Sequence, residues 1–244
     1  MGFVALCLWS IGFEPVSRSA LGVVVAACRA NASLLSSPLP CLAVDAGRTD
    51  DDGYAILREP GTRQRTILTA LASISGIEDP QLIAANAPNF FADAWRERHW
   101  LLSPGNATVD PPNGFALGIN SEFERSQDRL HIHMACLRPD VQRVLASRIV
   151  SLDPDRFAPL GFRLGGRWVW ATRVDGADAM DFNPLQTLRD RMPKVKAQIG
   201  RQTLIAVRET LPTGEPTIVL LTNPASGQGR GSFAVERFIR SGCD

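Results

Sequence analysis

The stretch RSQDRLHIHMAC, residues 125–136, holds two of the three histidines in this chain. Side chains alternate between the two faces of an extended strand. His131 and His133 therefore share one face with Arg129, and the apolar residues between them share the other. Two neighbouring imidazoles repel each other when both are protonated, so we expect them to be neutral or unequally protonated. The pattern predicts a strand with one face in the core and the other available for chemistry.

Three roles are open to the two histidines. In the first they are structural and satisfy backbone carbonyls. In the second they bind one zinc ion, which needs a third ligand; His99, Glu122 and Glu124 are candidates that no spacing favours. Arg129 would also repel the cation. In the third role, one histidine attacks phosphorus while the other histidine and Arg129 stabilise the phosphate oxygens. Only the third role accounts for the arginine.

The composition is that of an ordinary soluble protein. Apolar residues make up 45% and charged residues 21% of the 244 residues, and the formal net charge is +1. A chain of this length can bury a full core and fits one domain with elaborations. Because the net charge gives no basic field of the kind that attracts nucleic acid, we do not expect a nucleic-acid partner.

Apolar runs bounded by turn residues mix with segments of helical periodicity. Besides the histidine strand, strands are expected at 54–59, 64–71, 115–120, 167–174, 202–209 and 216–223. Helices are expected at 89–102, at 139–150 with Asp140 as N-cap, and at 183–200 with a break near Pro193. Turn residues at 60–62 and 211–215 predict two hairpins. Because strands and helices do not alternate strictly, we expect an α+β fold with an antiparallel sheet.

The N-terminus is apolar but irregular. One apolar run covers Met1–Phe13, and charged residues separate it from a second run at Ala20–Ala27. Neither run reaches the roughly 18 to 20 residues that span a bilayer. We therefore assign residues 1–19 to a degenerate signal or membrane-anchor segment and residues 20–244 to the folded domain. As an alternative, VAAC at 25–28 resembles a lipoprotein cleavage site that would lipidate the cysteine.

The chain has five cysteines and no C-x-x-C pair, so a zinc knuckle or ribbon is not expected. Two interpretations stay open. The cysteines are scattered buried thiols, or four of them form two disulfides in an oxidising compartment and Cys7 is left out because its segment is removed or embedded in the membrane. The second interpretation predicts an exported protein.

The histidine stretch resembles the histidine-triad superfamily of nucleotide hydrolases and transferases. The resemblance rests on LHIHMAC at 130–136, LGINS at 117–121 and the RSQ between them. It implies that His131 is the nucleophile, that His133 is the third histidine of the motif, and that Asn120 and Ser126 belong to the site. Arg129 stands where the motif has its first histidine, which is a departure. The implied fold is α+β, with a histidine-triad-like antiparallel sheet and flanking helices.

Within that superfamily the chain is similar to the bacterial CDP-diacylglycerol pyrophosphatases. The segments PLPCLAV, GYAILRE, PNFFADAWRERH and MPKVKAQIGRQTLIAV carry this similarity in the right order around the histidine stretch. It implies hydrolysis of CDP-diacylglycerol to CMP and phosphatidate at the periplasmic face of the bacterial inner membrane or in the periplasm. The implied partners are the lipid-nucleotide substrate and the membrane surface, with no cofactor and no metal. The alternatives are another nucleotide phosphoramidase or transferase, a catalytically silent nucleotide or lipid binder, and a zinc-dependent hydrolase.

Residue chemistry agrees with these roles. His131 would attack the cytidine-side phosphorus and form a nucleotidyl-histidine that water then hydrolyses. His133, Ser126 and Asn120 would hold the nonbridging oxygens, and Arg129 would add positive charge as a planar donor.

Two further segments bear on the substrate. We expect Gln127 to hold the residues that contact the substrate and not to contact the substrate itself. The aromatic face of PNFFADAW, residues 88–95, is a candidate lining for the mouth that admits the lipid, or it is simply core.

The resemblance also bears on the cysteines, because the family has cysteines at the four positions that correspond to Cys28, Cys41, Cys136 and Cys243. We predict disulfides between Cys28 and Cys41 and between Cys136 and Cys243. Cys136 alternates with the histidines along the strand, so the second bridge would lie on the face away from the chemistry.

Overall fold

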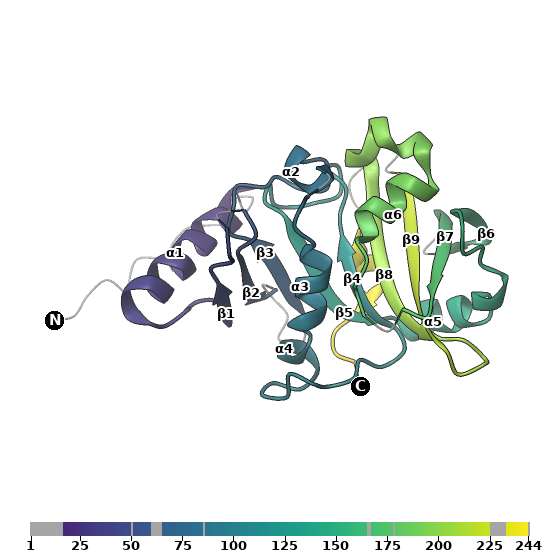
Figure 1. Ribbon diagram of the computed structural model, residues 1–244, viewed down its shortest axis with the longest axis horizontal. Coiled ribbons are helices and arrows are strands. Elements are labelled where there is room, and N and C mark those ends of the chain that lie inside the picture. Colours follow the sequence, from purple (N-terminus) through teal and green to yellow (C-terminus); the bar gives the residue numbers. More distant parts are fainter. Residues whose placement is uncertain are drawn as a thin grey trace.

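The computed structural model describes residues 17–49, 51–59, 65–84, 86–164, 167–177, 179–224 and 233–243. Among these residues the strands form one ten-stranded sheet in the order β1-β2-β3-β5-β4-β8-β9-β7-β6, with β10 paired to β5. All of the strand pairs are antiparallel. The predicted α+β class with an antiparallel sheet and flanking helices is confirmed (Figure 1). That this sheet is of the histidine-triad kind remains a prediction.

The strands are β1 (Ala43–Asp45), β2 (Tyr54–Arg58), β3 (Thr66–Ala70), β4 (Phe115–Ile119), β5 (His131–Leu137), β6 (Ala158–Leu164), β7 (Arg167–Asp175), β8 (Gln202–Thr210), β9 (Pro216–Pro224) and β10 (Ile239–Arg240). The α-helices are α1 (Ala20–Leu35), α2 (Pro80–Ile83), α3 (Phe90–Arg96), α4 (His99–Leu102), α5 (Pro139–Ala146) and α6 (Pro184–Arg191), and the 3₁₀ helices are η1 (Ile149–Ser151), η2 (Pro193–Arg201) and η3 (Val235–Arg237).

The two faces of the sheet are covered differently. On one face a continuous core packs beneath α2, α3, α6 and η2, and Figure 1 shows α3 and α6 in front of the strands. The opposite face is covered in two separate places. Residues of α1 pack over β2 and β3 at one end, while α5 and the C-terminal segment 233–239 pack over the central strands and the far end. The histidines of β5 lie on this second face.

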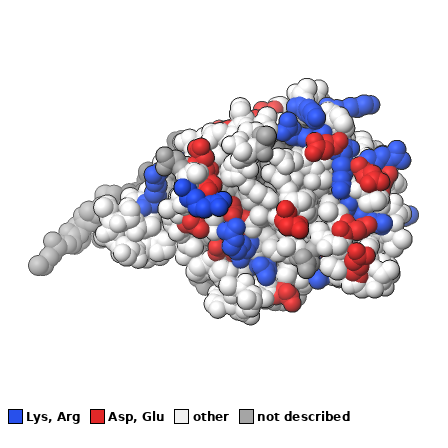
Figure 2. All heavy atoms as spheres, viewed as in Figure 1, with Lys and Arg blue, Asp and Glu red and all other residues white. Residues whose placement is uncertain are grey.

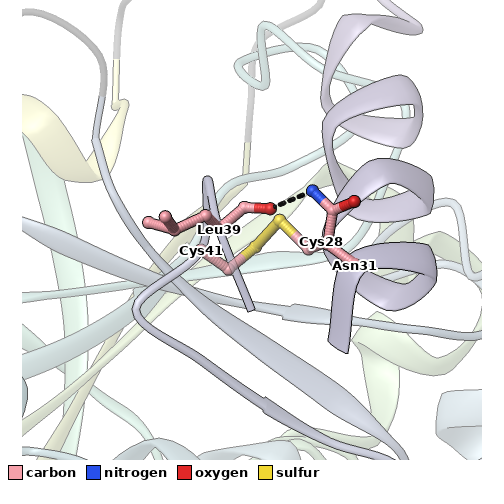
Figure 3. Close-up of a disulfide and its surroundings, with 4 residues drawn as sticks. All are labelled: Cys28, Asn31, Leu39 and Cys41. Carbon is pink, nitrogen blue, oxygen red and sulfur yellow. Dashed lines mark hydrogen bonds between the residues drawn. A yellow bond between two sulfur atoms is a disulfide. The ribbon is translucent and has the colours of Figure 1, made fainter. Parts of the chain in front are cut away.

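Helix α1 projects from the end of the sheet beside β1 and β2 (Figure 1). The predicted disulfide between Cys28 and Cys41 is confirmed and ties the middle of α1 to the residue two places before β1. Close by, the Asn31 amide donates a hydrogen bond to the Leu39 carbonyl at 2.6 Å (Figure 3). Among the described residues no helix is long and apolar enough to cross a membrane.

The second predicted disulfide, between Cys136 and Cys243, is also confirmed. Cys136 is buried in the core that lies beneath α3, on the face of β5 opposite the histidines. The bridge therefore ties the C-terminus to the non-catalytic face, as the alternation along the strand predicted. The proposed segment 1–19 and Cys7 cannot be compared with the structure, because residues 1–16 lie outside the described residues.

Several expected elements have different bounds. The helix expected at 89–102 is two helices, α3 and α4, and the N-cap of α3 is Asn89. Helix α5 begins at Pro139 with Arg138 as its N-cap, so the N-cap assigned to Asp140 was wrong. A proline fits the first helical position because its missing N–H has no partner there in any case. The turn expected at 60–62 lies outside the described residues, whereas the hairpin of β8 and β9 is confirmed.

Candidate active site

The two histidines lie side by side at the centre of the sheet. β5 pairs with β3 and β4, and His133 stands between Ile67 on one neighbour and Gly118 on the other. The imidazoles of His131 and His133 lie on the same face, with ring centroids 5.1 Å apart, and the residues are only 7% and 3% exposed. The residue between them, Ile132, is buried in the opposite core, so the predicted alternation is confirmed.

The glycine opposite His133 makes room for the C-terminal segment. A Cβ atom on Gly118 would lie 2.6 Å from a methyl group of Val235, closer than side-chain carbons approach in proteins. Asn120 fastens the same segment, since its Oδ1 accepts a hydrogen bond from the Val235 N–H at 2.8 Å. Its Nδ2 donates to Glu236 at 3.0 Å and lies 3.4 Å from His133 Nε2. Gly118 and Asn120 of the LGINS motif thus bring the carboxylate of Glu236 to the histidines.

His133 lies between two carboxylates. Its Nδ1 is 3.6 Å from Glu59, and its Nε2 is 3.6 Å from Glu236. Burial is the largest effect and disfavours the charged ring, but the attraction of Glu236 and Glu59 outweighs it and raises the pKa of His133. A protonated imidazole has two N–H donors, one toward each carboxylate. The arrangement therefore favours an imidazolium at this position.

His131 is in the opposite electrostatic state. Burial, and then repulsion from His133, lowers its pKa to about 4, so the ring is neutral near pH 7. Its Nδ1 lies 2.8 Å from the carbonyl oxygen of Arg129. Because a carbonyl only accepts hydrogen bonds, Nδ1 carries the proton and Nε2 keeps its lone pair. This is the tautomer that a nucleophilic histidine needs, and the unequal protonation matches the sequence-based expectation.

The histidines form one wall of a cavity of about 380 Å³. Ser126 and Gln127, from the loop before β5, line it together with Glu59 and Glu236. Gln127 also accepts a hydrogen bond from the Leu21 N–H near the start of α1, at 2.8 Å. Leu21 and other residues of α1 form the apolar side of the cavity. Ser126 and Gln127 are thus near the histidines, and the contact of Ser126 with substrate and the supporting role of Gln127 remain predictions.

Arg129 is turned toward β3. Its guanidinium donates to the carbonyls of Ala70 at 3.0 Å and Leu71 at 2.6 Å, and it does not line the cavity. In this position it stabilises the end of β3 and fixes the residue whose carbonyl orients His131. The role that the sequence predicts for the guanidinium, contact with the phosphate, remains a prediction.

The aromatic helix proposed as a lipid mouth faces the other way. Phe90, Phe91, Ala94 and Trp95 of α3 are buried in the core on the face of the sheet opposite the histidines. The core alternative is therefore correct. A larger pocket of about 940 Å³ lies between the β1–β2 loop and α3, but neither histidine of β5 lines it.

Among the described residues, the group of potential metal ligands is Glu59, His133 and Glu236, whose ligand atoms lie within 4.8 Å of one another. His99, Glu122 and Glu124, the residues considered as zinc ligands, do not belong to it. The Nδ1 of His133 lies 3.6 Å from Glu59 and its Nε2 lies 3.6 Å from Glu236, so each carboxylate stands beside a different nitrogen of the ring. This geometry fits an ion-paired imidazolium better than a bound metal ion.

Sequence reasoning missed Glu59 and Glu236. Glu59 is the last residue of GYAILRE, one of the segments that carry the family resemblance, so a signal was present. Glu236 had none, because it lies far along the chain in a segment without a recognisable pattern. The packing of Val235 against Gly118 and the hydrogen bonds of Asn120 bring it to the site.

Two comparisons with known proteins bear on this site. The family model for CDP-diacylglycerol pyrophosphatase matches residues 17–244. The CDP-diacylglycerol pyrophosphatase of Yersinia pestis is 36% identical over 189 residues, which cover 78% of this chain and 69% of that protein. The residues that the family model matches include the histidine strand, both pairs of cysteines and the C-terminal segment that carries Glu236. The chain belongs to the CDP-diacylglycerol pyrophosphatase family.

Proposed function

We propose that the protein hydrolyses the pyrophosphate bond of CDP-diacylglycerol to CMP and phosphatidate through a nucleotidyl-histidine at His131. The observation that carries the mechanism is the pairing of a neutral His131 with a buried His133 held between two carboxylates. The first is a nucleophile in its reactive form, and the second is a fixed positive charge for the phosphate oxygens.

The first step is attack on the cytidine-side phosphorus. The Nε2 lone pair of His131 forms the N–P bond, and the bridging P–O bond breaks, so phosphatidate leaves with the bridging oxygen. Positive charge develops on the His131 ring, and the Arg129 carbonyl that accepts its Nδ1–H stabilises it. His133 and the Asn120 amide offset the charge of the nonbridging oxygens, and Ser126 at the rim adds a donor.

The second step is attack by water on the nucleotidyl-histidine. A base must take a proton from the water, and Glu236 lines the cavity beside the histidines with its side chain 34% exposed. Burial raises the pKa of Glu236, but His133 and the Asn120 amide outweigh this effect and lower it, so the carboxylate is ionised near pH 7. The N–P bond then breaks, CMP leaves, and His131 regains its lone pair.

We place the reaction at the periplasmic face of the inner membrane or in the periplasm. Two disulfides in a chain of this size fit an oxidising compartment rather than a reducing cytosol. The substrate is a membrane lipid, so the enzyme must work at or near a membrane surface. Cell fractionation with a tagged full-length chain tests the location.

The test of the mechanism uses substrate labelled with ³²P at the cytidine-side phosphorus. Rapid alkaline quenching should trap label on the protein, and later acidification should release it, as expected for an alkali-stable and acid-labile phosphoramidate. His131→Ala should trap none, whereas His99→Ala, which changes the histidine outside the site, should behave like the unaltered enzyme.

A second experiment uses unlabelled substrate in heavy-oxygen water. The heavy oxygen should enter CMP and not phosphatidate. Heavy oxygen in phosphatidate would mean attack at the lipid-side phosphorus and would refute the role of His131.

A further inference from the structure

We propose that α1 and the facing strands β2 and β3 form the binding site for the acyl chains of the substrate. The proposal rests on the proposed function and names the part of the molecule that recognises the lipid. It replaces the aromatic helix α3, whose apolar face is used by the core.

The lining of the catalytic cavity contains both polar and apolar residues. Its reactive end holds the histidines and carboxylates, whereas Ala20, Leu21 and Val24 of α1 line the other end. Leu57 of β2 and Ile67 of β3 face them from the sheet. A cytidine has hydrogen-bonding edges on its base and ribose, which aliphatic side chains leave unsatisfied, so this end suits methylene groups better.

The outer surface of α1 carries large aliphatic side chains. Val23 is 70% exposed, Leu34 80% and Leu35 68%, which is unusual for three large aliphatic side chains on one helix. Arg29 is the one charged residue among the sixteen of α1, and Figure 2 shows this projecting end of the molecule as largely uncharged. The sequence before it, Met1–Phe13, is also apolar. The helix that lines the cavity therefore also carries exposed aliphatic side chains, which suit the lipid from which the substrate comes.

Helix α1 is fixed to the catalytic loop at its start. Gln127 accepts a hydrogen bond from the Leu21 N–H, and Arg18 forms an ion pair with Asp128. The disulfide at Cys28 fixes the middle of the helix. A wall held in this way keeps a constant distance from the histidines. The acyl chains would lie between α1 and the sheet while the pyrophosphate reaches His131.

The test compares CDP-diacylglycerols with short acyl chains, used below their critical micelle concentrations, with CDP-glycerol, which has no acyl chain. For the unaltered enzyme we expect kcat/KM to rise with each added methylene that enters the site, by up to about fourfold per methylene. Val24→Asn, which places an amide in the lining, should lower kcat/KM for the longest chain at least tenfold more than it lowers kcat/KM for CDP-glycerol. Val24→Trp, which fills the same space, should show the same selectivity.

The matched control is Val23→Asn, which makes the same change one residue away on the exposed side of α1. It should leave the rates with all of these monomeric substrates unchanged. An unaltered dependence on chain length in both Val24 variants would refute the acyl site, and so would an equal loss on CDP-glycerol in both. If the unaltered enzyme hydrolyses no CDP ester at all, the proposed function itself is wrong. Intact mass shows whether both disulfides have formed in each variant.

Discussion

The disulfide between Cys28 and Cys41 should stabilise the protein and hold α1 over the active site. Replacing both cysteines by serine removes a crosslink between residues 13 apart in sequence. Without the crosslink the unfolded chain gains conformational entropy, and this gain predicts a destabilisation of the folded protein by about 3 kcal/mol. The bridge between Cys136 and Cys243 closes a much longer loop, with a separation of 107 residues. The same reasoning predicts about 4.7 kcal/mol for its removal.

The assay is equilibrium unfolding in urea, followed by tryptophan fluorescence, for the unaltered protein and the two double-serine variants. Buried Trp95 in the main core reports global unfolding. We expect both variants to be less stable than the unaltered protein, and the variant that lacks the Cys136–Cys243 disulfide to be the less stable of the two. The reverse order, or no loss when the Cys28 bridge is removed, would refute the loop-entropy argument.

The activities should separate the two bridges in a different way. The small cluster beneath α1 consists of the disulfide and a few aliphatic residues of β2 and β3. Without the bridge the helix has little else to hold its C-terminal half, so hydrolysis of long-chain substrate should fall by more than hydrolysis of CDP-glycerol. Removing the bridge at Cys136 should affect both substrates alike, because Cys243 anchors the segment that carries Glu236.

Four more predictions concern the two histidines, the pH dependence of activity, Glu209 and the removal of metal ions. His131→Ala should abolish CMP release, whereas His133→Ala should retain activity reduced on the order of 10²- to 10³-fold, because it removes one positive charge that stabilises the phosphate oxygens. In a pH profile of kcat/KM, activity should fall below about pH 4, where His131 becomes protonated, and should fall again above pH 6.5 as His133 loses its proton; an alkaline limb unchanged in His133→Gln would contradict this assignment. Burial raises the pKa of Glu209 from 4.5 to about 7, so the folded state binds the extra proton and stability falls as pH rises between these values. Glu209→Gln should remove a penalty of about 3 kcal/mol in urea unfolding at pH 8 and change little at pH 4. EDTA should leave turnover intact, and stoichiometric zinc in active protein would overturn that expectation.

The alternation along β5 made much of this structure predictable from sequence. It placed the histidines on one face and Cys136 on the other, and both assignments are correct. The periodicity of apolar residues did not identify the environment of a segment where two environments produce the same pattern. The apolar stripe of α3 is the same whether it faces a core or a lipid, and the apolar run in α1 resembles a leader segment as closely as it resembles a helix.

The site depends on contacts between distant segments, and these are what the sequence does not show. Gly118 lies in β4 and Asn120 directly follows that strand, so the two residues, two places apart, face the histidine side of the sheet. Gly118 admits Val235 against the strand, and Asn120 accepts the Val235 N–H and donates to Glu236. The asparagine of the motif therefore has a task besides any contact with phosphate, because it sets the carboxylate that raises the pKa of the neighbouring histidine. Asn120→Ala should accordingly shift the alkaline limb of the pH profile, whereas loss of a phosphate contact alone would lower the rate at every pH.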